Sequence, residues 1–447
     1  MQNLHPENLF HVDGLAWVLL TLVAFIGLCT GAFAARYLQG DRHRGRFFGL
    51  MAALCASVAL MVSADHLLLL WLAWGASNLL LVSLMVHGRE WKAARAAGAL
   101  AGRYFLLGFV LIGTALGLLF LASGETSIQA LLRSPPEAIA LAPALLLLLI
   151  GAATQSAIWP FHRWLTSSLN SPTPVSALMH AGLVNGGGFL LVRFAPLYFE
   201  FPSLLTLMFA AGLATALLGT LWKLMQHDIK RMLACSTMAQ MGFMLAQCGL
   251  GLFPAAVAHL CWHGLYKAYL FLASADVARE TRLDSDRAPG FGTLLLALAC
   301  GALGSYGFAL ASGKPWLAGD TTLVLVAVAG IAASQFALAL LRPRPLARLP
   351  AAAAVTTLLG SAYGASVHLV ENALAPAGLA RPQPLEAIHL AAIALLTGAW
   401  LALVLLRRPG RNHRWPDWAL ALYVRALNAS QPHPATVTAQ RNHYNPV

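Results

Sequence analysis

Long apolar runs, separated by short polar loops, make up most of this chain. About 20 consecutive apolar residues are enough to cross the hydrocarbon core of a bilayer as an α-helix. Runs of that length predict about thirteen transmembrane helices. They lie near residues 15–37, 47–64, 66–86, 97–122, 138–158, 174–195, 203–225, 232–250, 253–275, 291–311, 321–342, 350–370 and 387–407. The sequence therefore predicts an all-α, polytopic membrane protein, and the composition of 59% hydrophobic and 10% charged residues agrees.

Basic residues alternate along the chain: they gather after the odd-numbered runs and are sparse after the even-numbered ones. The positive-inside rule then places the N-terminus outside and the C-terminus in the cytoplasm. The net charge of +12 is spread over short loops, so it does not indicate a nucleic-acid partner. The basic clusters are Arg42, Arg44 and Arg46; Arg89, Lys92 and Arg95; Arg163; Lys223, Lys230 and Arg231; Arg279, Arg282 and Arg287; Arg342, Arg344 and Arg348; and Arg407, Arg408, Arg411 and Arg414.

Two parts are expected: a transmembrane bundle over residues 1–407 and a cytoplasmic tail over residues 408–447. The tail is polar and contains Pro, with a short amphipathic piece around Trp415 to Leu427. It could be a frayed end. Its aromatic residues, such as Trp418, equally allow docking at the membrane interface or on a partner protein.

Three titratable residues, His259, His263 and Lys267, follow one another at i, i+4 and i+8 within an apolar run. On a helix they advance only about 40° per step, so they line one face at intervals of about 6 Å. A charge in the hydrocarbon is costly unless it faces the bundle interior or a water-filled path. The spacing therefore favours a proton relay. The alternatives are packing or zinc binding by the two histidines, and the Lys argues against a cation.

The segment GAATQSAIWPFHRWLTSSLNSPTPVSALMHAGLVNGGG carries Pro160, Pro172 and Pro174. Proline cannot continue a helix, so the backbone is expected to break there, at or near membrane depth. Such breaks are tolerated only inside protein or along a cavity. His180 follows the break, and it is either a functional residue of a broken-helix site or a satisfied core histidine.

Arg103 and Lys314 are two further cations in or beside apolar runs. Arg103 lies in the fourth run, where its long side chain can reach back to the cytoplasmic surface. Lys314 stands beside Pro315 after a nearly chargeless stretch, so it either caps a helix or marks a second break. A nucleotide-binding loop, a redox motif and a haem signature are all missing from the sequence, so any energy source is expected to be an ion gradient or a partner.

Three longer segments, SPTPVSALMHAGLV, HDIKRMLACSTMAQMGFM and AAVAHLCWHGLYKAYLFLASADV, resemble the antiporter-like membrane subunits of respiratory complex I and of multisubunit Na⁺/H⁺ antiporters. Upstream, FHVDGLAWVLL, GRFFGLMAALCASVALMVSADHLLLLWLAW and the segment around Arg103 follow the same order. The resemblance covers about residues 10–320. It implies a bundle with broken helices and a polar axis of Lys, His and Glu midway across the membrane.

Position by position, the resemblance gives His180 the place of the family's histidine after the Pro-rich break. It makes His259, His263 and Lys267 the family's His-His-Lys helix. Lys314 falls near a lysine of the family's second broken helix, in a segment that otherwise matches poorly. The resemblance thus implies proton or ion translocation through these residues, with Arg103 in the matching fourth run.

Two residues depart from the family pattern. Gly75, in LAWGASN, stands where the family has an acidic residue, and Gln155, in GAATQSA, stands where it has a lysine. That Lys–Glu pair is the usual input half of the proton path. The departures leave open whether this chain carries a complete path.

The run MHAGLVNGGGFLLVRFAPL and the ending ALNASQPHPATVTAQRNHYNPV are similar to DabB, the membrane subunits of the DAB inorganic-carbon accumulation systems of bacteria. This resemblance implies a partner of the DabA type, a zinc-containing protein similar to β-carbonic anhydrases, at the cytoplasmic face. It implies that an ion gradient drives one-way conversion of CO₂ to bicarbonate, with zinc on the partner and no cofactor on this chain.

Two other functions stay open. The chain could belong to a multisubunit Na⁺/H⁺ antiporter or a complex I-related proton-translocating complex. It could also be a non-conducting membrane anchor for a cytoplasmic enzyme, which the missing Lys–Glu pair allows. A path of His and Lys favours protons, because Na⁺ prefers oxygen ligands.

Overall fold

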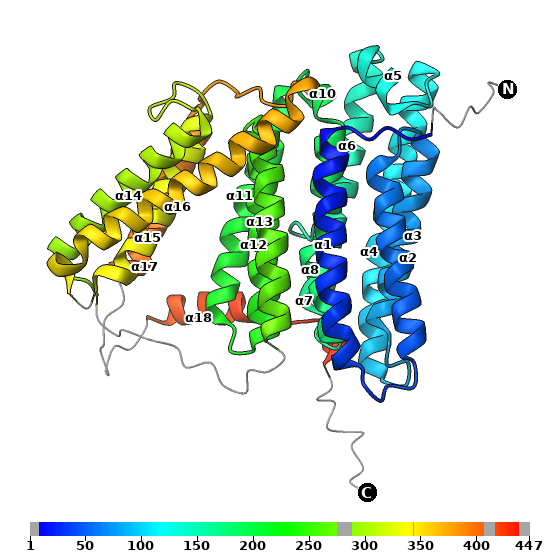
Figure 1. Cartoon of the computed structure of the whole chain (residues 1–447), viewed down its shortest axis with the longest axis horizontal. Coiled ribbons are helices and arrows are strands. Elements are labelled where there is room, and N and C mark those ends of the chain that lie inside the picture. The colour runs from blue at the N-terminus through cyan, green and yellow to red at the C-terminus, as the bar shows by residue number, and fades with distance from the viewer. Residues whose placement is uncertain (1–8, 275–287, 343, 406–415, 438–447) are drawn as a thin grey trace, which may run out of the picture. The chain divides into compact units, whose positions relative to one another are not determined.

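The structure is a computed structural model that describes residues 9–274, 288–342, 344–405 and 416–437. The regular elements of these residues are all helices, which confirms the predicted all-α class (Figure 1). They are α1 (Gly14–Tyr37), α2 (Arg44–Ser63), α3 (Leu67–Met85), α4 (Lys92–Ser123), α5 (Ile128–Arg133), α6 (Ala138–Gln155), α7 (Arg163–Thr166), α8 (Thr173–Ala181), η2 (Leu183–Asn185), α9 (Gly186–Arg193), α10 (Ala195–Tyr198), α11 (Pro202–Met225), α12 (Ile229–Gly249), α13 (Phe253–Ala273), α14 (Phe291–Ser312), α15 (Thr322–Leu341), α16 (Pro345–Leu374), η3 (Ala375–Ala377), α17 (Ala387–Leu405), α18 (Asp417–Ala429) and η4 (Pro434–Thr436).

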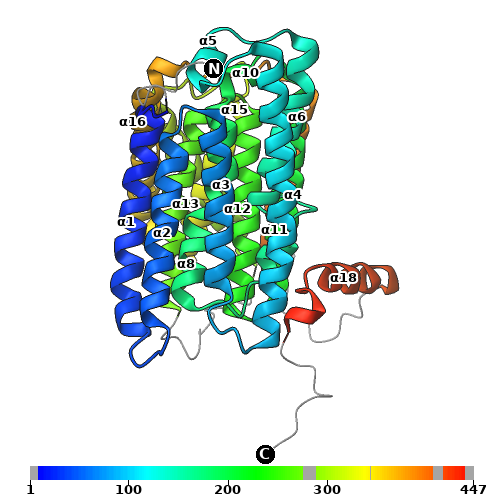
Figure 2. The same ribbon diagram turned by 90° about the vertical axis from the view of Figure 1, so that its right-hand side faces the viewer.

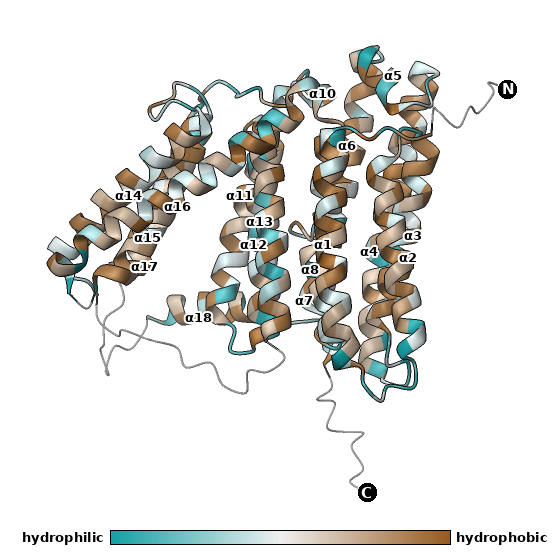
Figure 3. Ribbon diagram, viewed as in Figure 1, coloured by the Kyte–Doolittle hydropathy of each residue, from teal (hydrophilic) through white to brown (hydrophobic). Residues whose placement is uncertain are grey.

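Eleven helical segments of the described residues are long and apolar enough to cross a membrane. Helices α12 and α13, of 21 residues each, are of spanning length but fall outside that set. Both carry polar side chains within their length, among them the predicted relay residues of α13, and these lower their mean hydropathy. The predicted count of about thirteen therefore depends on these two helices. Figure 3 shows apolar residues along α1 to α4 and polar residues in the loops that join them.

The chain divides into two compact units. Unit 1 comprises residues 1–249, 259–277 and 420–447, and unit 2 comprises residues 250–258 and 278–419. The division follows packing, because contacts within each unit outnumber those between them, and a run of apolar spans in the sequence does not reveal such a boundary. Residues 408–415 and 438–447 of the expected tail lie outside the described residues.

Within unit 1, α11 and α12 pack so closely that glycine is required at the contact. A Cβ added at Gly212 would meet the backbone of Ala246, and one added at Gly242 would meet the backbone of Ala216. Small residues let helix backbones approach in a membrane, where van der Waals packing replaces the hydrophobic effect as the main attraction. This close contact fixes α12 as a rigid wall of the site described below.

The predicted break in the helices lies between α6 and α9 of unit 1. Helix α6 ends at Gln155, and Pro160 falls in the turns before the four-residue α7. Pro172 precedes α8 and Pro174 lies in its first turn, where proline is tolerated because its missing N–H would have no helical partner. A 3₁₀ turn, η2, then separates α8 from α9. In an 18-residue window of the segment Thr173–Arg193, 94% of the residues are buried, so this irregular backbone is enclosed by protein.

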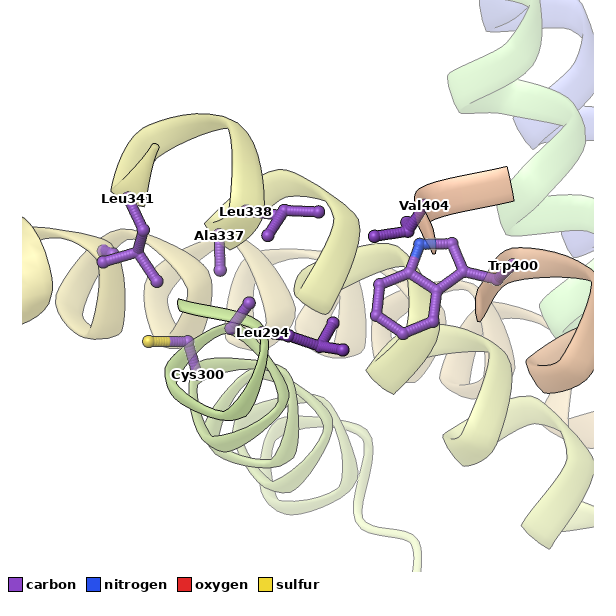
Figure 4. Close-up of a cluster of buried hydrophobic side chains, with 9 residues drawn as sticks. Leu294, Cys300, Ala337, Leu338, Leu341, Trp400 and Val404 are labelled. Atoms are coloured by element: carbon purple, nitrogen blue, oxygen red, sulfur yellow. The ribbon is translucent and has the colours of Figure 1, made fainter. Parts of the chain in front are cut away.

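Unit 2 is built from α14 to α17. A cluster of buried side chains joins α14, α15, α16 and α17 (Figure 4). Trp400 lies at one end of the cluster, and its indole Nε1 donates to Gln335 Oε1 at 2.8 Å. Helices α14 and α16 approach through glycine, since a Cβ on Gly360 would meet the backbone of Gly304. The cluster in Figure 4 consists of Leu294, Ala297, Cys300, Ala337, Leu338, Leu341, Ala352, Trp400 and Val404.

The C-terminal segment returns to the loops of unit 1. Its helix α18 runs across the direction of α1 to α4 in both views (Figures 1 and 2), and none of its side chains is buried. The residues that follow α18 in the chain form hydrogen bonds with other residues of unit 1. Gln226 Nε2 donates to Ser430 Oγ at 2.9 Å, and Asn170 Nδ2 donates to the carbonyl of Thr436 at 2.7 Å. The predicted amphipathic piece is therefore a helix tethered at its C-terminal end.

One side-chain hydrogen bond joins two loops at the basic end of unit 1. His87 Nε2 lies 2.9 Å from Asp41 Oδ2, which links the loop after α3 to the loop after α1. The hydrogen bonds from His87 and from the backbone N–H of His43 hold the pKa of Asp41 below its ordinary value of 3.8. The charged form of Asp41 is thus favoured by the fold.

Candidate ion-translocation site

The three predicted relay residues lie on one face of α13 in unit 1. The ring centroids of His259 and His263 are 6.3 Å apart and the planes differ by 20°, so the imidazoles follow each other along the helix. Lys267 continues the row, and its side chain is among the most deeply buried of the chain, with 1% exposure. The i, i+4, i+8 spacing therefore produces the row that helix geometry requires.

Lys267 is held by a backbone oxygen of α12. Its Nζ donates to the carbonyl of Leu233 at 3.0 Å. None of the ion pairs found among the described residues includes Lys267. A buried amine that has a hydrogen-bond acceptor but no carboxylate beside it gives up its proton at a lower cost than one locked in an ion pair.

His180, on α8, reaches the same carbonyl through a threonine. Its Nδ1 lies 3.1 Å from Thr237 Oγ1, and that hydroxyl donates to Leu233 O at 3.0 Å. Since the single hydroxyl proton goes to the carbonyl, Thr237 accepts from the imidazole, which fixes the proton on Nδ1. The ring of His180 also stacks on Phe271 of α13, with centroids 4.3 Å apart. The histidine after the break and the lysine of α13 are therefore joined through Thr237 and Leu233.

His263 has the freedom that a relay residue needs. It is buried, and neither of its ring nitrogens has a hydrogen-bond partner among the described residues. Nε2 of His259 also has no hydrogen-bond partner among the described residues. Imidazole can donate through one nitrogen and accept through the other, so an unpaired ring can take a proton from one side and pass one to the other.

Lys314 lies in the other unit. Helix α14 ends at Ser312, and Gly313 follows with a φ of +68°, a conformation that stops a helix. Lys314 comes next, and its Nζ lies 2.8 Å from Glu371 Oε2 near the end of α16. Of the two possibilities that the sequence left open, the structure places Lys314 at a helix end, in an ion pair of unit 2. Its part in translocation stays a prediction.

Arg103 lies on the surface of unit 1. Helix α4 begins at Lys92, earlier than the apolar run suggested, so Arg103 lies about three turns after its start. The residue is exposed rather than directed into the site. This position agrees with a side chain that extends along the helix surface.

The two departures from the family pattern have structural counterparts. A Cβ on Gly75 would stand 2.6 Å from Cε2 of Phe109, whose ring stacks on Trp71 with centroids 4.4 Å apart. The space that an acidic side chain would need is therefore filled by an aromatic ring. Gln155 is the last residue of α6, and its Nε2 donates to the carbonyl of Leu183 in the broken segment at 3.2 Å. A neutral amide thus occupies the place of the expected charge.

Sequence reasoning missed Thr237, the Leu233 carbonyl and Trp74. Thr237 lies in the segment HDIKRMLACSTMAQMGFM but has no charge to attract notice. Leu233 takes part through its backbone oxygen, and such a contact cannot be inferred from the residue type. Trp74 is buried and its indole Nε1 has no partner within the described ranges.

Comparison with known proteins finds two matching family models. Residues 64–342 match the family described as NADH:quinone oxidoreductase/Mrp antiporter, TM, and residues 1–48 match the family of the complex I chain 5 N-terminus. A probable inorganic carbon transporter subunit DabB2 of Halothiobacillus neapolitanus is 32% identical over 93% of this chain and 77% of its own length.

Two further likenesses are informative. A probable inorganic carbon transporter subunit DabB of Bacillus anthracis is 39% identical over 60% of this chain and 54% of its own length. The chain thus spans about half the length of that relative. A structure of the Mrp complex from Dietzia sp. DQ12-45-1b aligns with a TM-score of 0.57 and 25% identity, over 97% of this chain and 50% of the other.

Proposed function

Because the chain belongs to the NADH:quinone oxidoreductase/Mrp antiporter family of membrane proteins, we propose that it is the proton-conducting, energy-coupling membrane subunit of a bacterial inorganic-carbon accumulation complex. It is a multi-pass membrane protein with eleven helical segments of spanning length and composition among its described residues. What we propose is the ion that those helices conduct and the partner protein that uses its gradient.

One observation carries the conduction proposal: the connected set formed by His180, Thr237, the carbonyl of Leu233 and Lys267. These groups lie inside a bundle with an enclosed helix break, next to the unpaired imidazole of His263. Ionisable residues at membrane depth are costly and are kept where they move or bind charge. A merely structural pair of histidines has no need of a buried lysine one turn away.

The proton steps follow from the chemistry of these side chains. The ammonium of Lys267 loses one proton from Nζ, and the lone pair of an unpaired nitrogen of His263 takes it, leaving an amine and an imidazolium. The imidazolium then releases the proton from its other nitrogen toward His259, which restores neutral His263. About 6 Å separates residues one helical turn apart, so each transfer needs a side-chain swing or a bridging water.

The carbon proposal comes from the relatives. Both DabB proteins above carry the name inorganic carbon transporter subunit. We assign to this chain the same kind of complex, in the bacterial cytoplasmic membrane, with a zinc-containing, carbonic-anhydrase-like partner of the DabA type. The partner would perform the CO₂ chemistry, and this chain would conduct the protons whose gradient drives it, without enzymatic activity or a cofactor of its own.

The orientation supports a partner at the cytoplasmic face. The loops after α1, α3 and α11, which hold basic clusters, lie at the same end of unit 1 as the C-terminal segment (Figure 1). By the positive-inside rule that end faces the cytoplasm, which puts the N-terminus outside. The tethered helix α18 would then meet a cytoplasmic partner.

A second candidate is a subunit of a multisubunit antiporter or a complex I-related complex. The alignment with the Mrp complex structure favours it, since that likeness covers nearly the whole chain. The partner separates the two functions, because a carbon pump needs a zinc protein and an antiporter needs further membrane subunits.

The experiment is expression of the chain with its genomic neighbours in a host that lacks carbonic anhydrase. We expect growth in ambient air and copurification of a large zinc protein. Growth that needs added CO₂, together with copurification of membrane subunits alone, would favour the antiporter. A His263→Ala, Lys267→Met double variant that still supports growth would leave only the anchor function.

A further inference from the structure

Residues 430–437, which follow α18 and which we call the strap, are packed into unit 1. Ser430 and Thr436 of the strap are 3% and 2% exposed, and Pro432 is also buried. Helix α18, directly before the strap, has no buried side chain. Residues near the end of a domain are poorly ordered unless contacts tie them down. The strap is therefore held by the fold, whereas the helix that precedes it presents its side chains to the surroundings.

The first half of the strap bonds to the junction of α11 and α12. Gln226, the residue after α11, donates from Nε2 to Oγ of Ser430 at 2.9 Å. Arg231, in the first turn of α12, donates from Nη1 to Oε1 of Gln431 at 3.1 Å. The strap is thus attached to the start of the helix that carries Leu233.

The second half of the strap bonds to residues 167–172, the part of the helix break between α7 and α8 that we call the break loop. Ser167 Oγ accepts from the backbone N–H of His433 at 2.9 Å, and Asn170 Nδ2 donates to the carbonyl of Thr436 at 2.7 Å. Ser167 is 0% exposed, although loop residues usually face solvent. The turn η4 packs against α4. The strap therefore reaches from α11 and α12 across the break loop to α4.

The break loop is bonded to α12 as well. Lys230, in the first turn of α12, donates from Nζ to the carbonyl of Ser171 at 3.2 Å. One turn further along α12 lies Leu233, whose carbonyl accepts from Lys267 of the relay. The strap, the break loop and the start of α12 therefore form one hydrogen-bonded assembly that is continuous with the relay.

The place of the strap suits the control of conduction. A buried relay exchanges protons with the cytoplasm only through groups that reach water, and the seated strap bonds to the buried side chain of Ser167 at that end. A proton path that stayed open without its partner would dissipate the gradient that the proposed complex uses. The partner can act on the strap through α18, because Ser430 directly follows Ala429, the last residue of that helix.

We propose that the strap is an autoinhibitory plug, which closes proton conduction while it is seated, and that the partner opens the path by binding α18 and lifting the strap from the break loop and α12. This regulation rests on the proposed function above. A partner shifts such an equilibrium only by binding one state more tightly than the other. By linkage, a change that loosens the seat of the strap must open the path in the chain alone and tighten partner binding.

The first test is proton flux, under an imposed membrane potential, through the full chain purified without its partner and reconstituted in proteoliposomes. The double variant Ser167→Ala, Asn170→Ala removes both bonds from the break loop to the strap. The control is Ser168→Ala, which removes a buried hydroxyl that bonds the carbonyl of Leu165 at 2.7 Å. We expect flux at least tenfold faster through the double variant than through the parent chain, and no change in the control. A double variant as slow as the parent would overturn the plug.

Adding Lys267→Met to the double variant separates an opened path from a general leak. We expect the flux to return to the level of the parent chain. Flux that persists without Lys267 would mean that the variant damages the bundle, and this would also overturn the plug. Conduction by the assembled complex together with a closed double variant refutes the strap alone. A complex that does not conduct refutes the proposed function and its regulation together.

The second test is the affinity of the full chain for the zinc protein that copurifies with it, which does not depend on conduction. We expect the double variant to bind this protein at least threefold more tightly than the parent chain, because less binding energy is used to lift the strap. Ser168→Ala should bind as the parent does. Equal or weaker binding by the double variant would contradict the linkage between the strap and the partner.

The third test locks the strap in the assembled complex. Gln226→Cys and Ser430→Cys place two thiols at a contact that joins α11 to the strap. A short bifunctional thiol reagent that a reductant cleaves should lower proton flux at least tenfold, and reduction should restore it. Each single cysteine variant, treated in the same way, is the control for the native cysteines. Full flux with the strap cross-linked would show that conduction does not require its release.

Discussion

Lys267 and Thr237 donate to the same backbone acceptor: Nζ of the lysine and Oγ1 of the threonine each lie 3.0 Å from the carbonyl oxygen of Leu233. Because Thr237 also accepts from His180, this oxygen connects α8 to α13 through α12. A change of protonation at Lys267 would change the strength of its hydrogen bond to that carbonyl. The histidine of the broken segment and the lysine of the relay are thus coupled by geometry.

The coupling predicts that Thr237→Val lowers proton conduction while Thr237→Ser keeps most of it. Valine removes the hydroxyl that fixes the proton on Nδ1 of His180, and a hydrogen bond of this kind contributes about 1 kcal/mol, or roughly a fivefold effect. Thr220→Val is the control, since its hydroxyl faces outward and bonds the carbonyl of Ala216 in its own helix. Equal conduction by the two valine variants in proteoliposomes would contradict the coupling.

Two arginines at different depths should respond differently to substitution. Arg103 is exposed on α4, so Arg103→Lys should keep most transport. Arg193 is buried, with Nη1 2.6 Å from Asp13 Oδ2 and Nη2 3.0 Å from the carbonyl of Val62. Arg193→Leu removes the charged hydrogen bonds to Asp13, a partly exposed carboxylate that still accepts from the backbone N–H of Ala16, and should cost about 2 kcal/mol of stability. Transport in proteoliposomes checks the Arg103 variant, and thermal unfolding in detergent compares the stability of both variants. Lost transport by Arg103→Lys, or a larger fall in its melting temperature than that of Arg193→Leu, would refute this ranking.

The loop pair of Asp41 and His87 predicts a dependence of stability on acid. The fold holds the pKa of Asp41 below 3.8, so the ionised carboxylate stabilises the folded state above about pH 4. That contribution is lost as the pH falls through the lowered pKa. A partly exposed pair of this kind contributes less than about 1 kcal/mol.

Asp41→Asn should therefore flatten the change in melting temperature between pH 5 and pH 3. Glu90→Gln, which alters an exposed carboxylate after α3, is the control and should keep the slope of the parent protein. An unchanged slope in the Asp41 variant would show that other carboxylates set the acid response.

The C-terminal segment predicts how the partner is held. Residues after α18 bond to unit 1, as in the 3.1 Å contact between Arg231 Nη1 and Gln431 Oε1, while α18 leaves Trp418 72% exposed. Deletion of residues 412–447 should release the partner. The milder pair Trp418→Ser and Leu422→Ser should weaken copurification without lowering the melting temperature, since both side chains are exposed. If the truncated chain still copurifies with the full amount of partner, the partner binds elsewhere on the chain.

Local pattern accounts for much of this fold. The apolar runs predicted the helices because spanning length and hydropathy are properties of one segment. The prolines predicted the interruption before α8, and the i, i+4, i+8 spacing predicted the row on α13. Each of these inferences concerns residues that are near one another in the sequence.

Contacts between distant segments were beyond such reasoning. The carbonyl of Leu233 receives a lysine 34 positions away, and Gln155 binds a carbonyl 28 positions away. The pairing of Lys314 with Glu371 and the division into two units have the same origin. They depend on which helices pack together, and hydropathy does not specify that choice.

Proton flux into proteoliposomes under an imposed membrane potential shows directly whether Lys267 carries the proton through this chain. Lys267→Met keeps the length of the side chain and removes its charge, so folding and partner copurification should be unchanged. We expect at least a hundredfold loss of flux, and the same loss for Lys267→Arg, because a guanidinium does not release its proton. Normal flux through a correctly assembled Lys267→Met complex would mean that Lys267 does not carry the proton.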